Sequence, residues 1–228
     1  MQFIFLFLIL IFYSCNDSLS NIEIYSPSNN IEISVDNGEE ITYKVRFNGK
    51  IVINKSLLGM IFKDEGELFL NPKIVNVSEK NIDETWDLLW GEEKEIRNQY
   101  REKTISIENE GNKILVDLVF RAYNDGIAFR YNIKNQKEKK QSIVIINELT
   151  QFNLFEDAEA WWTPAYGENR YEELYRNSKI SKMDSSHTPL TIRYSDGIHL
   201  SIHEANLTDY SSMQVFYNEK NQLNCDLA

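Results

Sequence analysis

Cysteine, proline and histidine are scarce in this chain of 228 residues, which has two Cys, four Pro and three His. So few cysteines exclude a fold stapled by several disulfides, and the chain must be held together by its hydrophobic core. No Pro-rich or Gly-rich linker divides the sequence. We therefore expect one domain, and 228 residues are enough to bury a substantial core.

Positive charge is also in short supply, because 24 Lys and Arg stand against 35 Asp and Glu, a net charge of −11. A nucleic-acid-binding surface needs clustered Lys and Arg, so we expect no nucleic-acid partner. An acidic balance is compatible with a secreted protein that acts on neutral substrates, and with cation binding. Aromatic residues, in contrast, make up 12% of the chain, and this composition favours a large β protein.

The first 15 residues predict an export signal. The apolar run from Phe3 to Tyr13 is shorter than the roughly 20 residues that span a bilayer. Ser14-Cys15 follows it, and a small residue before a cysteine at this place resembles the lipobox of bacterial lipoproteins. We expect lipidation at Cys15 and a periplasmic or outer-membrane lipoprotein of a Gram-negative bacterium. An ordinary secretory signal and a retained membrane anchor are the alternatives, since no Lys or Arg precedes the run.

Alternation of apolar and polar residues predicts strands from Ile31 onward. The runs 31–35 and 41–47 are joined by Asp36-Asn-Gly38, and Asn48-Gly49 turns the chain into a third run. Asn-Gly supplies the positive φ angles that tight hairpin turns demand. Residues 22–228 are therefore expected to form an all-β domain, a large antiparallel β-sandwich.

Further strands are expected over 104–108, 113–123, 128–133 and 143–149, with a closing hairpin of 188–194 and 198–204. In the longest of these, one face is wholly apolar, through Ile114, Val116, Leu118, Phe120 and Ala122. The basic run 137–140 reads as a solvated hairpin tip. The segment 84–101 holds two tryptophans and then a charged stretch, and its sequence leaves a loop and a short helix equally open.

His199 and His203 do not predict a zinc site. In a strand, a four-residue step spans roughly 13 Å, too far for both to bind one zinc ion. Their order, His-x-x-x-His-Glu, also differs from the His-Glu-x-x-His of zinc proteases. We expect two strand histidines with ordinary hydrogen bonds.

An aromatic cluster, Trp161-Trp162-Thr-Pro-Ala-Tyr166, is expected to lie in a loop, with Tyr171 and Tyr175 close behind. Flat aromatic faces suit the apolar C–H faces of sugar rings, so Trp161 and Trp162 are candidate carbohydrate-binding residues. Packing in a core or a domain interface is the alternative.

No catalytic motif is present in the sequence. It lacks a Gly-x-Ser-x-Gly elbow, a phosphate-cradling Gly-rich loop and a Cys/His nucleophile pair. Paired carboxylates break glycosidic bonds, but among 35 acidic residues a pair such as Glu92 and Glu93 carries no information.

Several segments, taken in order, resemble the amino-terminal β-sandwich of glycoside hydrolase family 97, whose members are bacterial exo-acting α-glycosidases. They are Ser26-Pro27, Thr85-Trp86, Gly91-Glu92, Arg97–Tyr100, Phe120–Tyr131, Trp161-Trp162, Thr188–Thr191 and His203–Tyr210. No single segment is diagnostic, and their order along one chain carries the resemblance.

The resemblance implies a site that this chain does not complete. In the family, the catalytic residues lie in a (β/α)8 barrel that follows the sandwich, and a calcium ion lies near the sugar-cleaving site. Glu204 matches the position of a carboxylate ligand of that ion; an ordinary strand-end glutamate is the alternative. Calcium takes six to eight oxygen ligands, so the others would come from the barrel. The family domain also runs further, so we expect a truncated sandwich with unpaired backbone edges near 213–217.

The expected function is a non-catalytic carbohydrate-binding and support sandwich of an α-glucosidase or α-galactosidase, without catalytic residues and inactive alone. Its expected partners are an α-linked oligosaccharide, a separately encoded catalytic barrel, and a membrane through the lipid anchor. A stand-alone, lipid-anchored carbohydrate-binding module is the alternative, and a structural protein that binds no sugar is a third interpretation.

Overall fold

The computed structural model describes residues 21–109, 113–134, 143–165 and 172–227. Strands dominate this part of the chain, and one short 3₁₀ helix, η1 (Ile180–Lys182), is present. The strands are β1 (Asn21–Tyr25), β2 (Ile31–Asn37), β3 (Ile41–Phe47), β4 (Lys50–Leu58), β5 (Met60–Phe62), β6 (Gly66–Glu67), β7 (Pro72–Asp87), β8 (Glu95–Asn109), β9 (Leu115–Ala122), β10 (Ile127–Ile133), β11 (Ile145–Glu148), β12 (Gln151–Asn153), β13 (Glu159–Pro164), β14 (Arg176–Lys179), β15 (Ser185–Arg193), β16 (His199–Ile202), β17 (Met213–Asn218) and β18 (Gln222–Leu227). The all-β prediction is confirmed.

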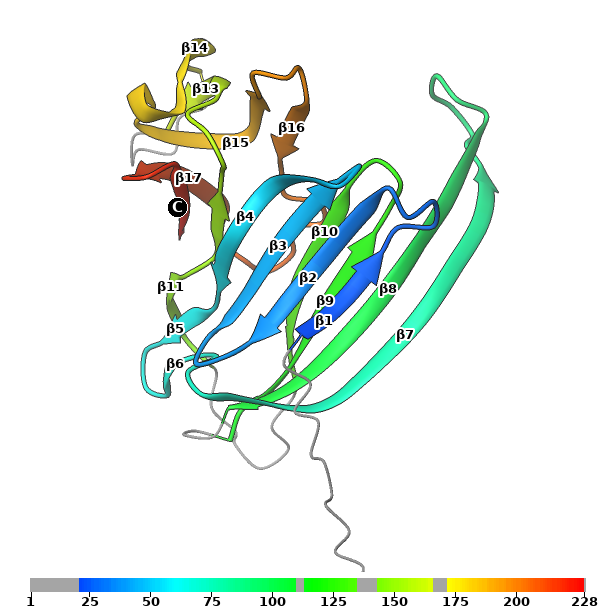
Figure 1. Ribbon diagram of the computed structural model, residues 1–228, viewed down its shortest axis with the longest axis vertical. Coiled ribbons are helices and arrows are strands. Elements are labelled where there is room, and N and C mark those ends of the chain that lie inside the picture. Colours follow the sequence, from blue (N-terminus) through cyan, green and yellow to red (C-terminus); the bar gives the residue numbers. More distant parts are fainter. Residues whose placement is uncertain (1–20, 110–112, 135–142, 166–171, 228) are drawn as a thin grey trace, which may run out of the picture.

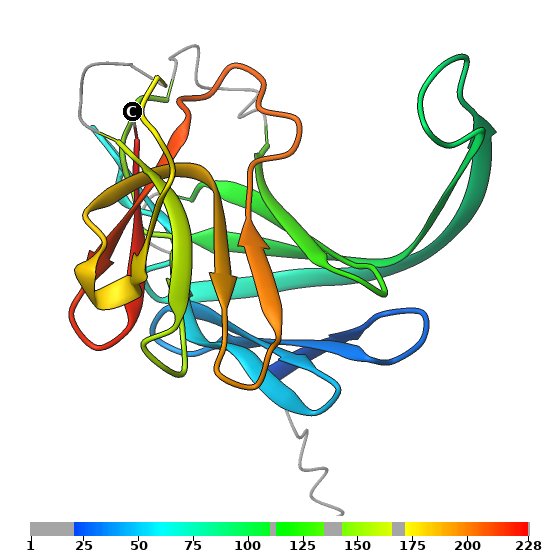
Figure 2. The ribbon, with the colours of Figure 1, turned by 90° about the horizontal axis from the view of Figure 1, so that it is seen from above.

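The strands form three antiparallel sheets, which pack as a sandwich. The largest sheet runs β1-β2-β3-β4-β12-β18-β17-β15-β13-β14, with β16 paired to β15. A second sheet runs β10-β9-β8-β7, and a third, small sheet runs β11-β5-β6. In Figures 1 and 2, β1–β4 form one layer and β7–β10 the layer behind it. The antiparallel sandwich expected from the sequence is therefore the observed architecture.

Aromatic side chains join the two layers. Tyr43 on β3 is fully buried, with its ring centroid 6.2 Å from that of Phe120 on β9 and 5.4 Å from that of Phe129 on β10. The Tyr43 hydroxyl donates a 2.8 Å hydrogen bond to the Gln151 backbone carbonyl, so its polar group is satisfied although it is buried. A buried tyrosine satisfied in this way contributes a large apolar area at no polar cost.

The hairpins predicted from turn residues are confirmed. β2 pairs with β3, and β3 with β4 across the Asn48-Gly49 turn. Asn48 has φ 49° and Gly49 has φ 80°, the left-handed backbone that these two residue types adopt most easily.

The apolar face expected on the strand near residues 113–123 is also confirmed. Val116, Leu118, Phe120 and Ala122 on β9, and Ile114 just before it, are each at most 2% exposed. They point into the space between the two layers, where they form the centre of the core.

The segment 84–101 is neither a helix nor wholly a loop. β7 and β8 pair in unbroken register from Asn76 with Ser106 to Asp87 with Glu95, so most of the segment lies in one long hairpin that extends beyond the sandwich (Figures 1 and 2). This hairpin could not be predicted from the sequence. Most residues of both strands are polar, so the alternation that marks a half-buried strand is weak.

The unpaired backbone edge expected near residues 213–217 is not found there. β17 lies between β15 and β18, and β18 pairs in turn with β12, so both strands lie inside the large sheet. Among the described residues, no helix has the length and apolar character needed to cross a membrane.

Candidate functional site: a carboxylate pair beside a polar pocket

Glu204, the residue singled out as a calcium ligand, lies in the loop 203–212, which returns the chain from β16 to β17. Its side chain is half-buried, and its Oε2 accepts a 3.0 Å hydrogen bond from the Met213 backbone N–H. This bond closes the loop 203–212 at its base and fixes the direction of the carboxylate.

The two histidines near it show no metal-binding arrangement. His199 is exposed on β16, with its Nδ1 3.0 Å from the Gly197 carbonyl oxygen, and His203 is exposed just past the strand. The ordinary hydrogen bond expected for a strand histidine is thus found at His199.

A second carboxylate, Glu148 at the end of β11, was not singled out from the sequence. It is only 9% exposed and accepts two hydrogen bonds, from Thr150 Oγ1 to Oε1 at 2.6 Å and from the Tyr210 hydroxyl to Oε2 at 3.0 Å. Tyr210 belongs to the same loop 203–212, so Glu148 anchors the far end of that loop to the sandwich.

The hydrogen bonds behind Glu148 form a chain that points at the carboxylate. The Gly59 N–H donates to the Tyr131 hydroxyl at 3.2 Å, and the Tyr131 and Thr150 hydroxyls lie 2.8 Å apart. Because the Thr150 proton is directed to Glu148, the Tyr131 hydroxyl is the donor to Thr150. Chained bonds of this kind polarise one another and favour a negative charge at their end.

Opposing effects act on the pKa of Glu148. Burial raises the pKa of this carboxyl above its usual range, and the nearby negative charge of Glu204 raises it further. The hydrogen bonds from Thr150 and Tyr210 oppose the increase. Burial and the charge of Glu148 also raise the pKa of the Tyr210 phenol. Two neighbouring carboxylates in a partly desolvated place are a local excess of negative charge that a cation would neutralise.

The residues present fit a share of a calcium site and not a whole one. Within the described part of the chain, no three His, Cys, Asp or Glu side chains are grouped so as to hold a metal ion. Glu204 uses one carboxylate oxygen for Met213 N–H, and calcium needs six to eight oxygens in all. Glu204 keeps its second carboxylate oxygen outside the Met213 bond, and that oxygen is enough for one such ligand position.

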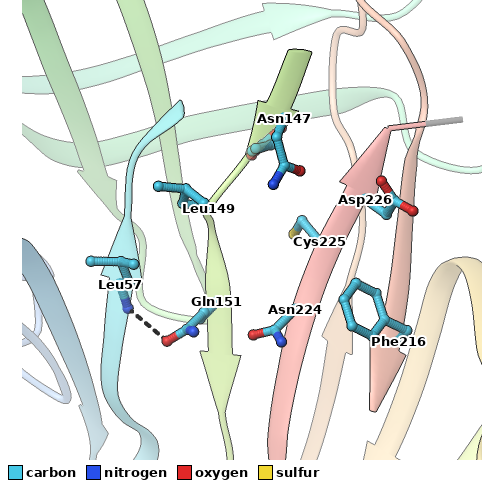
Figure 3. Close-up of a pocket in the computed structure, with 9 residues that line it drawn as sticks. Leu57, Asn147, Leu149, Gln151, Phe216, Asn224, Cys225 and Asp226 are labelled. Atoms are coloured by element: carbon cyan, nitrogen blue, oxygen red, sulfur yellow. Dashed lines mark hydrogen bonds between the residues drawn. The ribbon is translucent and has the colours of Figure 1, made fainter. Parts of the chain in front are cut away.

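A pocket of about 310 Å³ opens beside Glu148 (Figure 3). Its wall combines amides and carboxylates with three large apolar side chains; the lining residues are Leu57, Asn147, Glu148, Leu149, Gln151, Phe216, Asn224, Cys225 and Asp226. Gln151 is held by a 3.3 Å hydrogen bond from the Leu57 N–H to its Oε1. Asn224 Oδ1 is buried and accepts no hydrogen bond from the described residues.

The two tryptophans lie in a strand, β13, and not in the loop expected from the sequence. Trp162 is 3% exposed, its Nε1 donates a 3.0 Å hydrogen bond to Ser178 Oγ, and the Arg176 guanidinium lies 5.3 Å from its ring centroid. Its neighbours on the same face, Ala160 and Pro164, are buried as well, so this face of β13 belongs to the core. A side chain so enclosed offers no open face to a sugar.

Trp161, on the opposite face of β13, is half-buried, and the Arg193 guanidinium lies 5.3 Å from its ring centroid. Trp161 and Trp162 therefore do not form one aromatic platform, and the structure brings neither to the carboxylate pair. Tyr166, Tyr171, the run 137–140 and the lipidation candidate Cys15 lie outside the described residues.

Comparisons with known proteins identify the family. The model of the domain described as "Glycosyl-hydrolase 97 N-terminal" matches residues 24–227. The chain belongs to this family of glycoside hydrolase amino-terminal domains. It is 26% identical over 210 residues to a retaining alpha-galactosidase of Bacteroides thetaiotaomicron, a match that covers 85% of this chain and 30% of that protein.

Solved structures agree with this assignment. Family 97 enzyme structures from Pseudoalteromonas sp. strain K8, one of a variant in complex with panose and one in complex with acarbose, have a TM-score of 0.85 and 33% identity, over 90% of this chain and 32% of each enzyme. A beta-arabinopyranosidase at 22% identity, with a TM-score of 0.80 over 90% of this chain and 35% of its own, shares the fold. The chain spans about a third of the length of the relatives it matches.

Proposed function

We propose that this sandwich is the non-catalytic support domain of an exo-acting α-glycosidase, an α-glucosidase or α-galactosidase, and that it supplies Glu204 as one calcium ligand to a site completed by a catalytic (β/α)8 barrel. Its membership of the family supports the proposal. So do the relatives, because one is a retaining alpha-galactosidase and others are family 97 enzymes with panose or acarbose bound.

The observation that carries the proposal is the state of Glu204. Its carboxylate is held in place by the Met213 N–H, lies close enough to Glu148 to raise the pKa of that carboxyl, and leaves one oxygen free of the Met213 bond. A strand-end glutamate without a hydrogen-bond partner would have no such constraint. A fixed carboxylate in a place of excess negative charge is what a shared cation site requires from one of its two sides.

When bound, a calcium ion would supply positive charge and a fixed point for oxygen ligands near the reacting sugar. This chain's share is to orient one carboxylate toward the partner. Glu148 and Tyr210 hold the loop that carries that carboxylate. The proton donors and acceptors that break the glycosidic bond belong to the barrel, and the sandwich alone is inactive.

The test uses a joined polypeptide, in which this chain replaces the matching third of the Pseudoalteromonas enzyme. Pure chain alone is expected to leave an aryl α-glycoside unhydrolysed and to bind calcium no more tightly than about millimolar, the range of weak sites. The joined polypeptide is expected to hydrolyse the glycoside in a calcium-dependent manner. Hydrolysis by the chain alone would overturn the proposal.

A second candidate function is a stand-alone, lipid-anchored carbohydrate-binding module, and the pocket beside Glu148 favours it. Asn147, Gln151, Asn224 and Asp226 offer donors and acceptors for hydroxyl groups, and Phe216, 36% exposed, offers an aromatic surface for the C–H face of a sugar. Calorimetric titration of the chain with panose tests it, and Phe216→Ala should abolish the heat of binding. An absence of binding by the unaltered chain would exclude this function.

Export and lipidation at Cys15 remain part of both proposals. Metabolic labelling with palmitate is expected to mark the protein in a Gram-negative host, and Cys15→Ser is expected to remove the label. A labelled Cys15→Ser protein would show that the lipid is attached elsewhere.

A further inference from the structure

The long β7–β8 hairpin includes a part that no third strand supports, residues 82–100, here called the arm. β9 pairs with β8 only as far as Ala122 opposite Arg101, so beyond that point the sheet has two strands. The arm projects away from the sandwich in both views (Figures 1 and 2). An isolated two-stranded ribbon is at best marginally stable in water, so an arm of this length is expected to gain stability from something packed against it.

The two faces of the arm differ sharply. Residues directly opposite each other in an antiparallel pair share a face, and successive residues alternate between faces. One face carries the pairs Asp83–Gln99, Thr85–Arg97 and Asp87–Glu95. It is wholly polar, and the Arg97 guanidinium donates two hydrogen bonds to the Asp83 carboxylate, at 2.8 Å and 2.7 Å. The other face carries the pairs Ile82–Tyr100, Glu84–Asn98 and Trp86–Ile96, which include all four large apolar residues of the arm's strands.

The tip of the arm, residues 88–94, is open to solvent and holds a run of large apolar residues followed by charged ones. Leu89 is 98% exposed and Trp90 is 87% exposed, while Trp86, on the apolar face nearby, is 45% exposed. Scattered apolar residues are normal on a surface, but two tryptophans and a leucine gathered at the end of one projecting ribbon are typical of an interaction site. Tryptophan is also the residue type most enriched among the anchors of protein interfaces.

The apolar face of the arm continues the outer face of the four-stranded sheet. The Arg121 guanidinium lies 4.5 Å from the Tyr100 ring centroid, so these two side chains share a face. Arg121 lies on the face of β9 opposite to the core residues Phe120 and Ala122. In Figure 2 the arm bends toward the side of this sheet on which the loop 203–212 lies.

We infer that the arm is a docking surface for the catalytic part of a family 97 polypeptide, which would contact the arm's tip and apolar face together with the loop that carries Glu204. The contact at Glu204 rests on the proposed function; the contact at the arm rests on the exposed apolar residues. The family 97 enzyme structures that match this chain with a TM-score of 0.85 have about two thirds of their length outside the matched part. A body of that size, placed against Glu204, lies on the side toward which the arm bends.

Hydrogen–deuterium exchange of the arm amides tests the inference, in the chain alone and in the joined polypeptide. The chain alone is expected to be a monomer by light scattering, with an arm that exchanges fast. In the joined polypeptide the arm amides should exchange at least about tenfold more slowly than in the chain alone, because opening of the arm would require the partner to leave. The double variant Leu89→Ser/Trp90→Ser should lose that protection, and the matched variant Thr85→Ser/Gln99→Asn, on the polar face, should keep it.

Several results would overturn the inference. Equal exchange of the arm in both proteins, or separate unfolding of the two parts of the joined polypeptide, would show that the arm has no partner there. A dimer of the chain alone whose arm is protected would identify a second copy as the occupant, and protection by panose alone would identify a sugar.

One further result would separate the two proposals. Loss of calcium binding with the arm still protected would contradict the role of Glu204 and support the arm as a docking surface.

Discussion

The Tyr210 hydroxyl donates a 3.0 Å hydrogen bond to Glu148 Oε2, and this bond joins a loop residue to a strand 62 positions earlier in the chain. Together with the bond from the Met213 N–H to Glu204, it holds the loop 203–212 at two points. The position of the proposed calcium ligand therefore depends on a second, buried carboxylate.

Removing that hydroxyl should weaken the protein and loosen the loop. Tyr210→Phe leaves Glu148 with one donor fewer, and loss of a hydrogen bond to a charged group costs about 1.5–3 kcal/mol in the free energy of unfolding. Urea unfolding measures the loss. Tyr217→Phe is the matched control, since the Tyr217 hydroxyl makes no hydrogen bond to the described part of the chain and its removal should change little. Equal effects of both variants would contradict the role given to Tyr210.

The pH dependence of stability should carry the signature of Glu148. Its pKa is raised in the folded state, chiefly by burial, so the folded protein binds a proton more readily than the unfolded chain does. The contribution of Glu148 to stability is then fully present below the ordinary glutamate pKa of 4.5 and is lost as the pH rises through the raised value. The groups that act on this titration are Glu204, Tyr210 and Thr150.

Glu148→Gln should lack this decline, so the difference between the unaltered and variant curves of unfolding free energy should fall as the pH rises through the raised pKa of Glu148. The glutamine oxygen still accepts the bond from Tyr210, and Thr150 can turn to accept from the amide. Denaturant unfolding at a series of pH values checks the expectation. A variant whose curve stays parallel to that of the unaltered protein would show that Glu148 does not titrate in this range.

The two tryptophans should respond differently to truncation. Trp162→Ala leaves a cavity in the core and is expected to cost about 3–5 kcal/mol in the free energy of unfolding. Trp161→Ala, at a half-buried position on the other face of β13, should cost clearly less. Thermal or urea unfolding compares them. If Trp162→Ala unfolded like the unaltered protein, the burial of its side chain would be in doubt.

Cys225 should be unreactive in the folded protein. Its side chain is 3% exposed, and burial raises the pKa of the thiol well above its ordinary value, so little reactive thiolate forms. Labelling by a thiol reagent, followed by peptide mass analysis, should find Cys225 modified only when the chain unfolds. Fast modification under native conditions would show that β17 and β18 open readily.

The sequence predicted those parts of the fold that rest on local patterns. Ile114 to Ala122 could be assigned to a buried face because their alternation is complete, and Asn48-Gly49 could be assigned to a turn because few other pairs accept that backbone. Trp162 was misplaced because aromatic residues beside a proline suggest a loop, while its burial depends on the strands packed around β13.

Glu148 could not be found from the sequence, because nothing near it marks it out among 35 acidic residues. Its importance comes from Tyr210 and Glu204, which only the folded sheet brings to it. The arm was missed for a related reason, since Glu84 and Asn98 interrupt the apolar residues on its face and leave no regular alternation to detect.

The central claim is that Glu204 is a calcium ligand shared with a catalytic partner, and calorimetric calcium titration of the joined polypeptide tests it most directly. We expect the joined polypeptide to bind calcium much more tightly than the chain alone does. Glu204→Gln should weaken this binding at least about tenfold, the loss expected for one ligand oxygen donor. Asp209→Asn, an exposed change in the same loop, should leave the affinity unaltered. Calcium binding with the same affinity in the Glu204→Gln and unaltered proteins would contradict the account.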